Sequence, residues 1–196
     1  MRFSFRSIIT LAFGLAFFSF SAAFGAGPVK VIFDTDMCQD CDDVGALAVL
    51  NTFADQGKAE ILACVANGHD RDKAIAASIS AINTYYGRPD VAIGTYQGPG
   101  HPATPSPYTA KLRDEFPHAA KPDDEEPRAV DVYRRTLAAA PDGSVVIVSV
   151  GFLVNLRDLL ESKPDALSPL AGIDLVRQKV KKLVVMGGDF PQGGPE

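Results

Sequence analysis

Short apolar segments alternate with helical segments along most of the chain, and this alternation constrains the fold more than any other feature. The segment SVVIVSV (144–150) is almost wholly apolar, as expected of a strand that is covered on both faces. Within 70–87, large apolar residues step by four, three and four positions from Ile75 to Tyr86, which is the period of an amphipathic helix. Strands are predicted at 29–34, 61–67, 91–96, 144–150 and 181–188, and helices at 43–55, 70–87, 129–140 and 153–162. This alternation is typical of an α/β fold, and we predict an open, mostly parallel, Rossmann-like sheet with helices on both faces.

A Pro-rich region separates the third predicted strand from the helix at 129–140. It runs from QGPGHPATPSPY through a short helical piece to KPDDEEP, and so long a loop is typical of a lid or a surface insertion. The run DDEE at 123–126 is predicted to lie in a solvated loop, because blocks of like charge rarely do more.

The first 26 residues have the order of a secretory signal peptide. Two arginines in MRFSFR precede the apolar run SIITLAFGLAFFSFSAAF, and small residues follow near Gly25 and Ala26. We therefore expect an exported protein, periplasmic or secreted, whose single α/β domain covers 27–196 and which leaves the membrane after cleavage. An uncleaved membrane anchor is the alternative, since the apolar run is about the length of a short span.

The charge balance bears on the partners of the chain. The formal net charge is −5, and no cluster of Lys and Arg interrupts the acidic background. Because binding to phosphate backbones needs such clusters, nucleic acid is not an expected partner.

The stretch DTDMCQDCDD (34–43) places five aspartates directly after the first predicted strand. Carboxylates at this density repel one another unless a cation lies among them. Calcium prefers such oxygen ligands and tolerates flexible geometry. The stretch is therefore interpreted as a calcium site, and the alternative is a group of turn and helix-capping aspartates that face water.

The same stretch contains two of the three cysteines, Cys38 and Cys41, in the spacing C-x-x-C. Neighbouring Asp40 and Asp42 would raise a thiol pKa, which disfavours a redox site. A local disulfide and a pair of inert small residues both stay open.

Ligands of open parallel sheets bind beyond the carboxyl ends of the strands. This rule places the acidic stretch on one rim with the loops that follow Asn67, Val150 and Met186.

Several blocks resemble the inosine-uridine preferring nucleoside hydrolases, in the branch with a longer first loop. VIFDTDMCQDCDDVGALAVL is similar to the family's strand, D-x-D-P-G-x-D-D-A loop and helix. AEILACVANG, AINTYYGRPDVAIGTY, VSVGFLVNLRDLL and KKLVVMGGDFPQGGPE resemble later family elements in the family's order, over 29–196.

The resemblance implies calcium-dependent hydrolysis of the N-glycosidic bond of ribonucleosides or related ribosyl compounds. Asp36 would be the general base and a metal contact. Asp42 and Asp43 would form the pair in which one residue binds calcium and the other the ribose hydroxyls. Asp34 would support them, and Val154 would offer calcium its backbone carbonyl where the family usually has Thr.

The resemblance also implies residues that bind the sugar. Asn67, Met186 and Glu196 match ribose-binding positions, and Asn155 matches a supporting one. The residues alone allow simpler roles, because Met186 could belong to the core, Asn67 could end its strand and Asn155 could brace a loop.

Family members are longer than this chain, and their C-terminal part contributes another metal aspartate. The chain stops at Glu196, so we expect weak or no hydrolase activity from it alone. Its last strand is expected to be an exposed edge or an unpaired tail, which favours instability or association, the latter as a homo-oligomer.

Two other functions stay open. An exported module that binds calcium or a sugar without catalysis would need the same acidic loop. A haloacid-dehalogenase-like phosphohydrolase also begins with a strand and D-x-D, but Cys38 stands where that family prefers Thr or Val, and GGD at 187–189 matches its later motif poorly.

Overall fold

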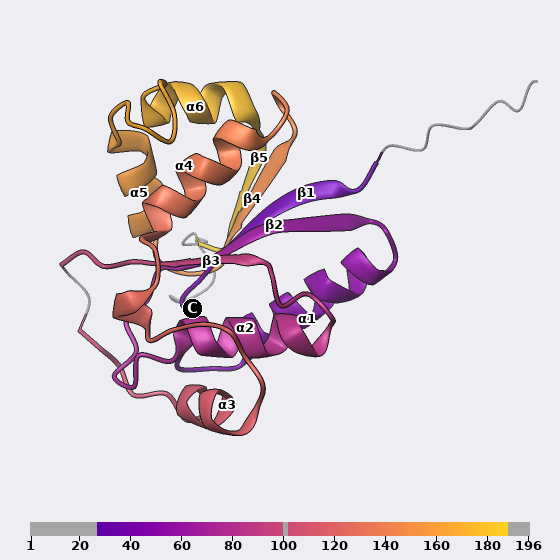
Figure 1. Ribbon diagram of the computed structural model, residues 1–196, viewed down its shortest axis with the longest axis vertical. Coiled ribbons are helices and arrows are strands. Elements are labelled where there is room, and N and C mark those ends of the chain that lie inside the picture. Colours follow the sequence, from indigo (N-terminus) through magenta and orange to yellow (C-terminus); the bar gives the residue numbers. More distant parts are fainter. Residues whose placement is uncertain (1–26, 100–101, 188–196) are drawn as a thin grey trace, which may run out of the picture.

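The computed structural model describes residues 27–99 and 102–187, and it contains one five-stranded parallel sheet (Figure 1). The strand order β3-β2-β1-β4-β5 puts β1 at the centre, and every neighbouring pair is parallel. The strands are β1 (Val29–Thr35), β2 (Ala59–Ala66), β3 (Ala92–Thr95), β4 (Val145–Ser149) and β5 (Val180–Val185). The predicted α/β fold with an open parallel sheet is confirmed.

Helices cover both faces of this sheet, as predicted (Figure 1). Adjacent strand residues point to opposite faces, so Ile32 packs in one core with Tyr133, whereas Phe33 packs in the other with Leu47. The first core lies under α4 (Ala129–Ala139), α5 (Val154–Glu161) and α6 (Gly172–Lys179), and the second under α1 (Asp42–Asp55) and α2 (Ile75–Tyr85).

Helix α2 begins five residues later than predicted. The carboxylate of Asp70 accepts hydrogen bonds from the backbone N–H groups of Asp72 and Ala74, and Lys73 adopts a left-handed φ of 52°. A left-handed residue cannot continue a right-handed helix, so these residues form a turn ahead of Ile75.

Helix α6 was not predicted from the sequence. It is only eight residues long, and it runs directly into β5 at Val180 without a separating turn. A helix of two turns with no Gly or Pro at its end gives little periodic signal.

The Pro-rich region contains α3 (Thr109–Glu115) and a short 3₁₀ helix, η1 (Asp123–Glu125). The prediction that DDEE lies wholly in water is wrong for Asp123. Its carboxylate accepts hydrogen bonds from the backbone N–H groups of Ile75 and Ala76, at the start of α2. Free N–H groups at a helix start favour such a carboxylate, which holds the loop against the helix.

Strand β5 lies at the edge of the described sheet. Leu183, Val184 and Val185 are each more than a third exposed. The expectation of an exposed last strand is met within the described residues, and association into an oligomer stays a prediction. Within those residues, no helix is both long enough and apolar enough to span a bilayer.

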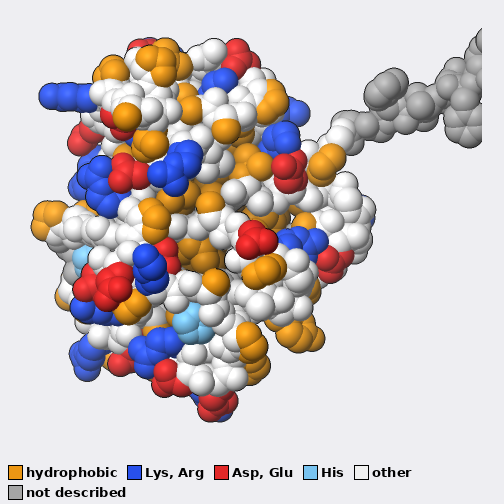
Figure 2. Space-filling model, in the orientation of Figure 1, with side chains coloured by type: hydrophobic (Ala, Val, Ile, Leu, Met, Phe, Trp, Pro, Cys, Tyr) orange, Lys and Arg blue, Asp and Glu red, His pale blue; other side chains and the backbone are white. Residues whose placement is uncertain are grey.

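Acidic and basic side chains lie interspersed on the face shown in Figure 2. Arg128 pairs with Asp131 and Arg157 with Asp158, at 2.7 Å in both cases. These exposed pairs shape the surface but contribute little to stability.

Candidate functional site

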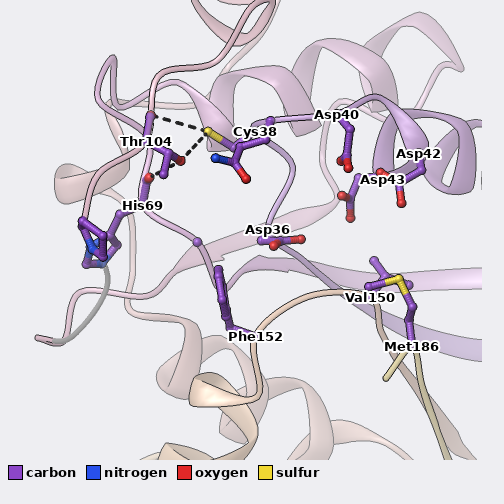
Figure 3. A pocket seen from close by; sticks show the side chains of 13 residues that line it. Asp36, Cys38, Asp40, Asp42, Asp43, His69, Thr104, Val150, Phe152 and Met186 are labelled. Atoms are coloured by element: carbon purple, nitrogen blue, oxygen red, sulfur yellow. Dashed lines mark hydrogen bonds between the residues drawn. The ribbon is translucent and has the colours of Figure 1, made fainter. Parts of the chain in front are cut away.

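A pocket of about 170 Å³ lies where the carboxyl ends of β1, β2, β4 and β5 meet. Each strand end contributes to it because all of these strands run in the same direction. Figure 3 shows carboxylates gathered on one side of the pocket, Asp36 in the middle and Phe152 and His69 toward the other side. The pocket thus has an acidic end and an aromatic end.

The acidic end is formed by three carboxylates at the start of α1. One oxygen each of Asp40, Asp42 and Asp43 lies within 4.8 Å of the others. Asp43 is buried and accepts a hydrogen bond from the hydroxyl of Thr35, whereas Asp40 and Asp42 are exposed. The three side chains therefore form a ring of hard oxygen donors with one buried member.

Burial and like charge disfavour the ionised form of these groups. Burial raises the pKa of Asp43 to about 7, and the nearby carboxylates of Asp36, Asp42 and Asp40 act in the same direction. The pKa of Asp40 is also raised, mainly through its hydrogen bond with Asp42. A divalent cation bound among these oxygens would offset the repulsion between the carboxylates and favour their ionised form. The donor set therefore fits calcium.

A second polar group lies beneath the pocket, around the buried carboxylate of Asp34. It accepts hydrogen bonds from Tyr133 at 2.8 Å, Asn67 at 2.9 Å and Asn155 at 3.0 Å. Burial nevertheless raises the pKa of Asp34 to about 7, since it outweighs the three donors. Asp34 therefore ties β1 to β2, α4 and α5 directly under the site.

Asn67 links this buried group to the rim. Its amide nitrogen donates to Asp34, while its amide oxygen accepts the backbone N–H of Phe152 at 3.0 Å. The adjacent Gly151 leaves no room for a side chain, because a Cβ at this position would lie 2.5 Å from Oδ1 of Asp36. The loop after β4 is thus held close to the acidic loop after β1.

The residues predicted from the sequence fall into four groups. Asp36, Asp42, Asp43 and Met186 line the pocket together. Asp34, Asn67 and Asn155 are buried below it and are connected by hydrogen bonds, Val154 begins α5 without lining the pocket, and Glu196 lies outside the described residues. Their roles in catalysis and binding stay predictions.

Sequence reasoning assigned no role to Phe152 or His69, which form the aromatic end of the pocket. Phe152 is 45% exposed although it is large and apolar. Its place in VSVGFLVNLRDLL, directly after a strand end, was the available signal. The ring of His69 stacks on that of Tyr96, with 5.4 Å between centroids and 23° between planes.

The two cysteines of C-x-x-C are free thiols in the structure. Cys38 is buried and lies 3.3 Å from the hydroxyl of Thr104, whereas Cys41 is exposed. Burial raises the pKa of Cys38, which opposes formation of a reactive thiolate.

Comparison with known proteins relates the chain to one family. Residues 31–195 match the family described as inosine-uridine preferring nucleoside hydrolase. No curated protein matches the chain.

Two solved structures have a similar fold. One is the type III effector protein XopQ complexed with adenosine diphosphate ribose, with a TM-score of 0.62 and 24% identity over 85% of this chain and 45% of the effector. The other is the effector protein XOO4466, with a TM-score of 0.63 and 23% identity over 88% of this chain and 48% of the effector. The chain spans about half the length of both structures.

Proposed function

Because the chain belongs to the inosine-uridine preferring nucleoside hydrolase family, we propose that its acidic pocket binds a ribosyl compound and hydrolyses the N-glycosidic bond. One observation carries the proposal: Asp36, Asp40, Asp42 and Asp43 converge in a single pocket at the carboxyl end of the central strand. Inosine and uridine are the substrates with which the proposal is tested.

Calcium is the proposed cofactor. Asp40, Asp42 and Asp43 would hold it, since their oxygens lie close together and prefer a hard cation. When bound, the ion would supply positive charge that holds the ribose hydroxyls and lowers the pKa of a water molecule.

Asp36 is proposed as the general base. It lies in the pocket between the carboxylate ring and Phe152, where it can accept a proton from water beside the sugar (Figure 3). The leaving base departs as the sugar gains oxocarbenium character, and the surrounding carboxylates stabilise that positive charge.

Binding of a ribosyl compound without hydrolysis is the second candidate. The structure of XopQ, which has a similar fold, contains adenosine diphosphate ribose. This candidate keeps the role of the pocket in ribose binding and removes only the role of Asp36 as a base.

The decisive experiment measures two properties of each variant: the rise in melting temperature on adding calcium, and the release of ribose from inosine and uridine. We expect Asp43→Asn to lose both properties. Asp36→Asn should lose roughly 100-fold or more in turnover, as expected for removal of a general base, while it keeps most of the calcium response.

Asp142→Asn is the control, since the exposed carboxylate of Asp142 pairs with Lys179 and does not line the pocket. Calcium binding without ribose release in the unchanged protein would favour the second candidate. If calcium does not alter the melting temperature, the proposed metal site is refuted.

Export is a further part of the proposal. It rests on the predicted signal peptide at 1–26, a segment that lies outside the described residues. Fractionation of a bacterial host that expresses the full chain should place the protein in the periplasm or the medium. Recovery of the uncleaved chain from the cytoplasm would refute export.

A further inference from the structure

Part of the Pro-rich region, residues 102–109, lies against the acidic loop that follows β1. Pro102 and Thr104 line the acidic pocket together with the carboxylates. The hydroxyl of Thr104 lies 3.3 Å from the sulfur of Cys38, and the backbone carbonyl of Thr104 lies 3.6 Å from the same sulfur (Figure 3). This segment therefore forms part of the wall of the pocket.

A second contact of the segment reaches the backbone of the acidic loop. The hydroxyl of Tyr108 donates a hydrogen bond of 2.8 Å to the backbone carbonyl of Asp40. One carboxylate oxygen of Asp40 lies within 4.8 Å of oxygens of Asp42 and Asp43. Tyr108 thus holds one member of the carboxylate ring by its main chain and leaves the oxygens of its side chain available.

The position of Tyr108 is itself fixed by the fold. Its ring is partly buried and packs against the core under α1 and α2, which includes Met37 of the acidic loop. The hydroxyl of Ser106 accepts hydrogen bonds from the backbone N–H groups of Tyr108 and Thr109. The hydroxyl of Thr109 in turn donates to the buried carboxylate of Asp70 at 2.8 Å. The hydroxyl of Tyr108 is therefore a donor in a fixed place.

The contact acts at the middle of the acidic loop. At the start of the loop, the N–H of Met37 donates to the hydroxyl of Thr35, and at its end the N–H of Gly45 donates to the carbonyl of Cys41. Asp40 lies between these two contacts, and its side chain is exposed. Because the neighbouring carboxylates repel it, the place of its carboxylate in the ring depends on where its backbone is held.

We propose that Tyr108 is a positioning residue of the metal site, which holds the carboxylate of Asp40 among the oxygen donors and so strengthens the binding of calcium. Without this hydrogen bond, Asp40 would move away from Asp42 and Asp43, and the ion would lose one oxygen ligand. This inference rests on the proposed binding of calcium by these three residues.

The test is Tyr108→Phe, which keeps the packed ring and removes only the hydroxyl. The dissociation constant for calcium is measured calorimetrically, and the melting temperature is measured without calcium. We expect calcium to bind roughly three- to tenfold more weakly, as for the loss of one hydrogen bond. The melting temperature without calcium should fall no further than in the control variant.

Tyr96→Phe is the control. The hydroxyl of Tyr96 also donates to a backbone carbonyl at 2.8 Å, that of Pro99, and Tyr96 does not line the acidic pocket. This variant should bind calcium as the unchanged protein does. An unaltered calcium affinity in Tyr108→Phe, or an equal loss of affinity in both variants, would overturn the inference.

Asp40→Ala tests whether Tyr108 acts through Asp40. This variant lacks the carboxylate that Tyr108 positions, so adding Tyr108→Phe to it should change the dissociation constant for calcium less than twofold. A loss of affinity by the same factor with and without the Asp40 carboxylate would mean that Tyr108 only supports the fold, which also overturns the inference.

The outcomes separate this inference from the proposed function. If the unchanged protein and Tyr108→Phe bind calcium equally well, the inference fails alone and the proposed metal site stands. If the unchanged protein binds no calcium, the inference and the proposed metal site fail together.

Discussion

The hydroxyl of Tyr133, on α4, donates a hydrogen bond of 2.8 Å to the carboxylate of Asp34 at the end of β1. Both side chains are fully buried. The same carboxylate also accepts hydrogen bonds from Asn67 and Asn155. One buried acid therefore connects the helical layer to the loop that shapes the pocket.

Replacing Tyr133 by Phe removes one of three donors to a carboxylate that has no access to water. We expect the free energy of unfolding to fall by about 1–3 kcal/mol, the cost of leaving a buried polar group less satisfied. Chemical denaturation measures the change. Tyr85→Phe is the control, because Tyr85 is 81% exposed, and equal effects of the two substitutions would contradict the argument.

Gly151 and Gly45 should respond to Ala with opposite signs. A Cβ at position 151 would lie 2.5 Å from Asp36 and 2.6 Å from Asn67, so we expect a loss of about 1–3 kcal/mol in the free energy of unfolding. A Cβ at position 45, within α1, meets nothing within 4 Å, so Ala there should stabilise by about 0.5–1 kcal/mol.

Chemical denaturation of both variants checks the signs. Gly151→Ala should also reduce the release of ribose from inosine, since the added Cβ would displace the carboxylate of Asp36, the proposed general base. A stable Gly151→Ala variant with unchanged ribose release would show that the close approach of the two loops is not needed.

Asp123 predicts a pH dependence of stability. Burial raises its pKa from 3.8 to about 6 in the folded protein. The folded state therefore holds this proton more tightly than the unfolded state, and stability decreases as pH rises from about 4 to about 6. Above that pH range the contribution of Asp123 to the free energy of unfolding is constant.

Comparison of the unchanged protein with Asp123→Asn isolates this effect, because other groups titrate in both. Relative to the variant, the unchanged protein should lose on the order of 2–3 kcal/mol between pH 4 and pH 7. The neighbouring Asp124→Asn is the control. Its carboxylate pairs with Lys73, which lowers its pKa, so no loss with rising pH is expected from it. A pH-independent difference for Asp123→Asn would contradict the prediction.

Much of the fold could be predicted because the spacing of apolar residues that marks a strand or a helix is found within a short stretch of sequence. The apolar run 144–150 and the stepped residues of α2 were sufficient for their elements. Helix α6 was missed because it is short and continues directly into β5. The start of α2 was misplaced because the turn at Asp70 depends on hydrogen bonds that a periodic pattern does not encode.

Some residues of the candidate site were likewise predicted from the sequence, and others were not. Asp36, Asp42 and Asp43 were found because they follow a strand end and match the loop of the family that the sequence resembles. Met186 was found because it matches a family position and follows a strand that ends on the same rim. Phe152 and His69 were not singled out, since a place in a loop after a strand end indicates the rim of the sheet but does not show that an aromatic ring lines the pocket. Asp123 was predicted to face water, because its contact with α2 joins segments almost fifty residues apart and is not visible in the local sequence.

Arg134 is a buried cation whose guanidinium group holds the segment between α5 and α6. It is 1% exposed and forms a two-pronged pair with Asp165, at 2.8 Å and 3.0 Å. Its remaining hydrogen bonds go to the hydroxyl of Ser162 and to the backbone carbonyls of Ser168 and Leu170. These contacts need the planar, five-donor shape of arginine and not only its charge.

Arg134→Lys should therefore destabilise the protein by roughly 3 kcal/mol, because an ammonium group keeps the charge but leaves several buried acceptors without donors. Urea denaturation measures the loss, and limited proteolysis should show earlier cleavage between Ser162 and Gly172. Arg135→Lys is the control, since Arg135 is exposed on the same helix and its change should have an effect within about 0.5 kcal/mol. If both variants unfold at the same urea concentration, charge alone explains the role of Arg134 and the fork geometry does not matter.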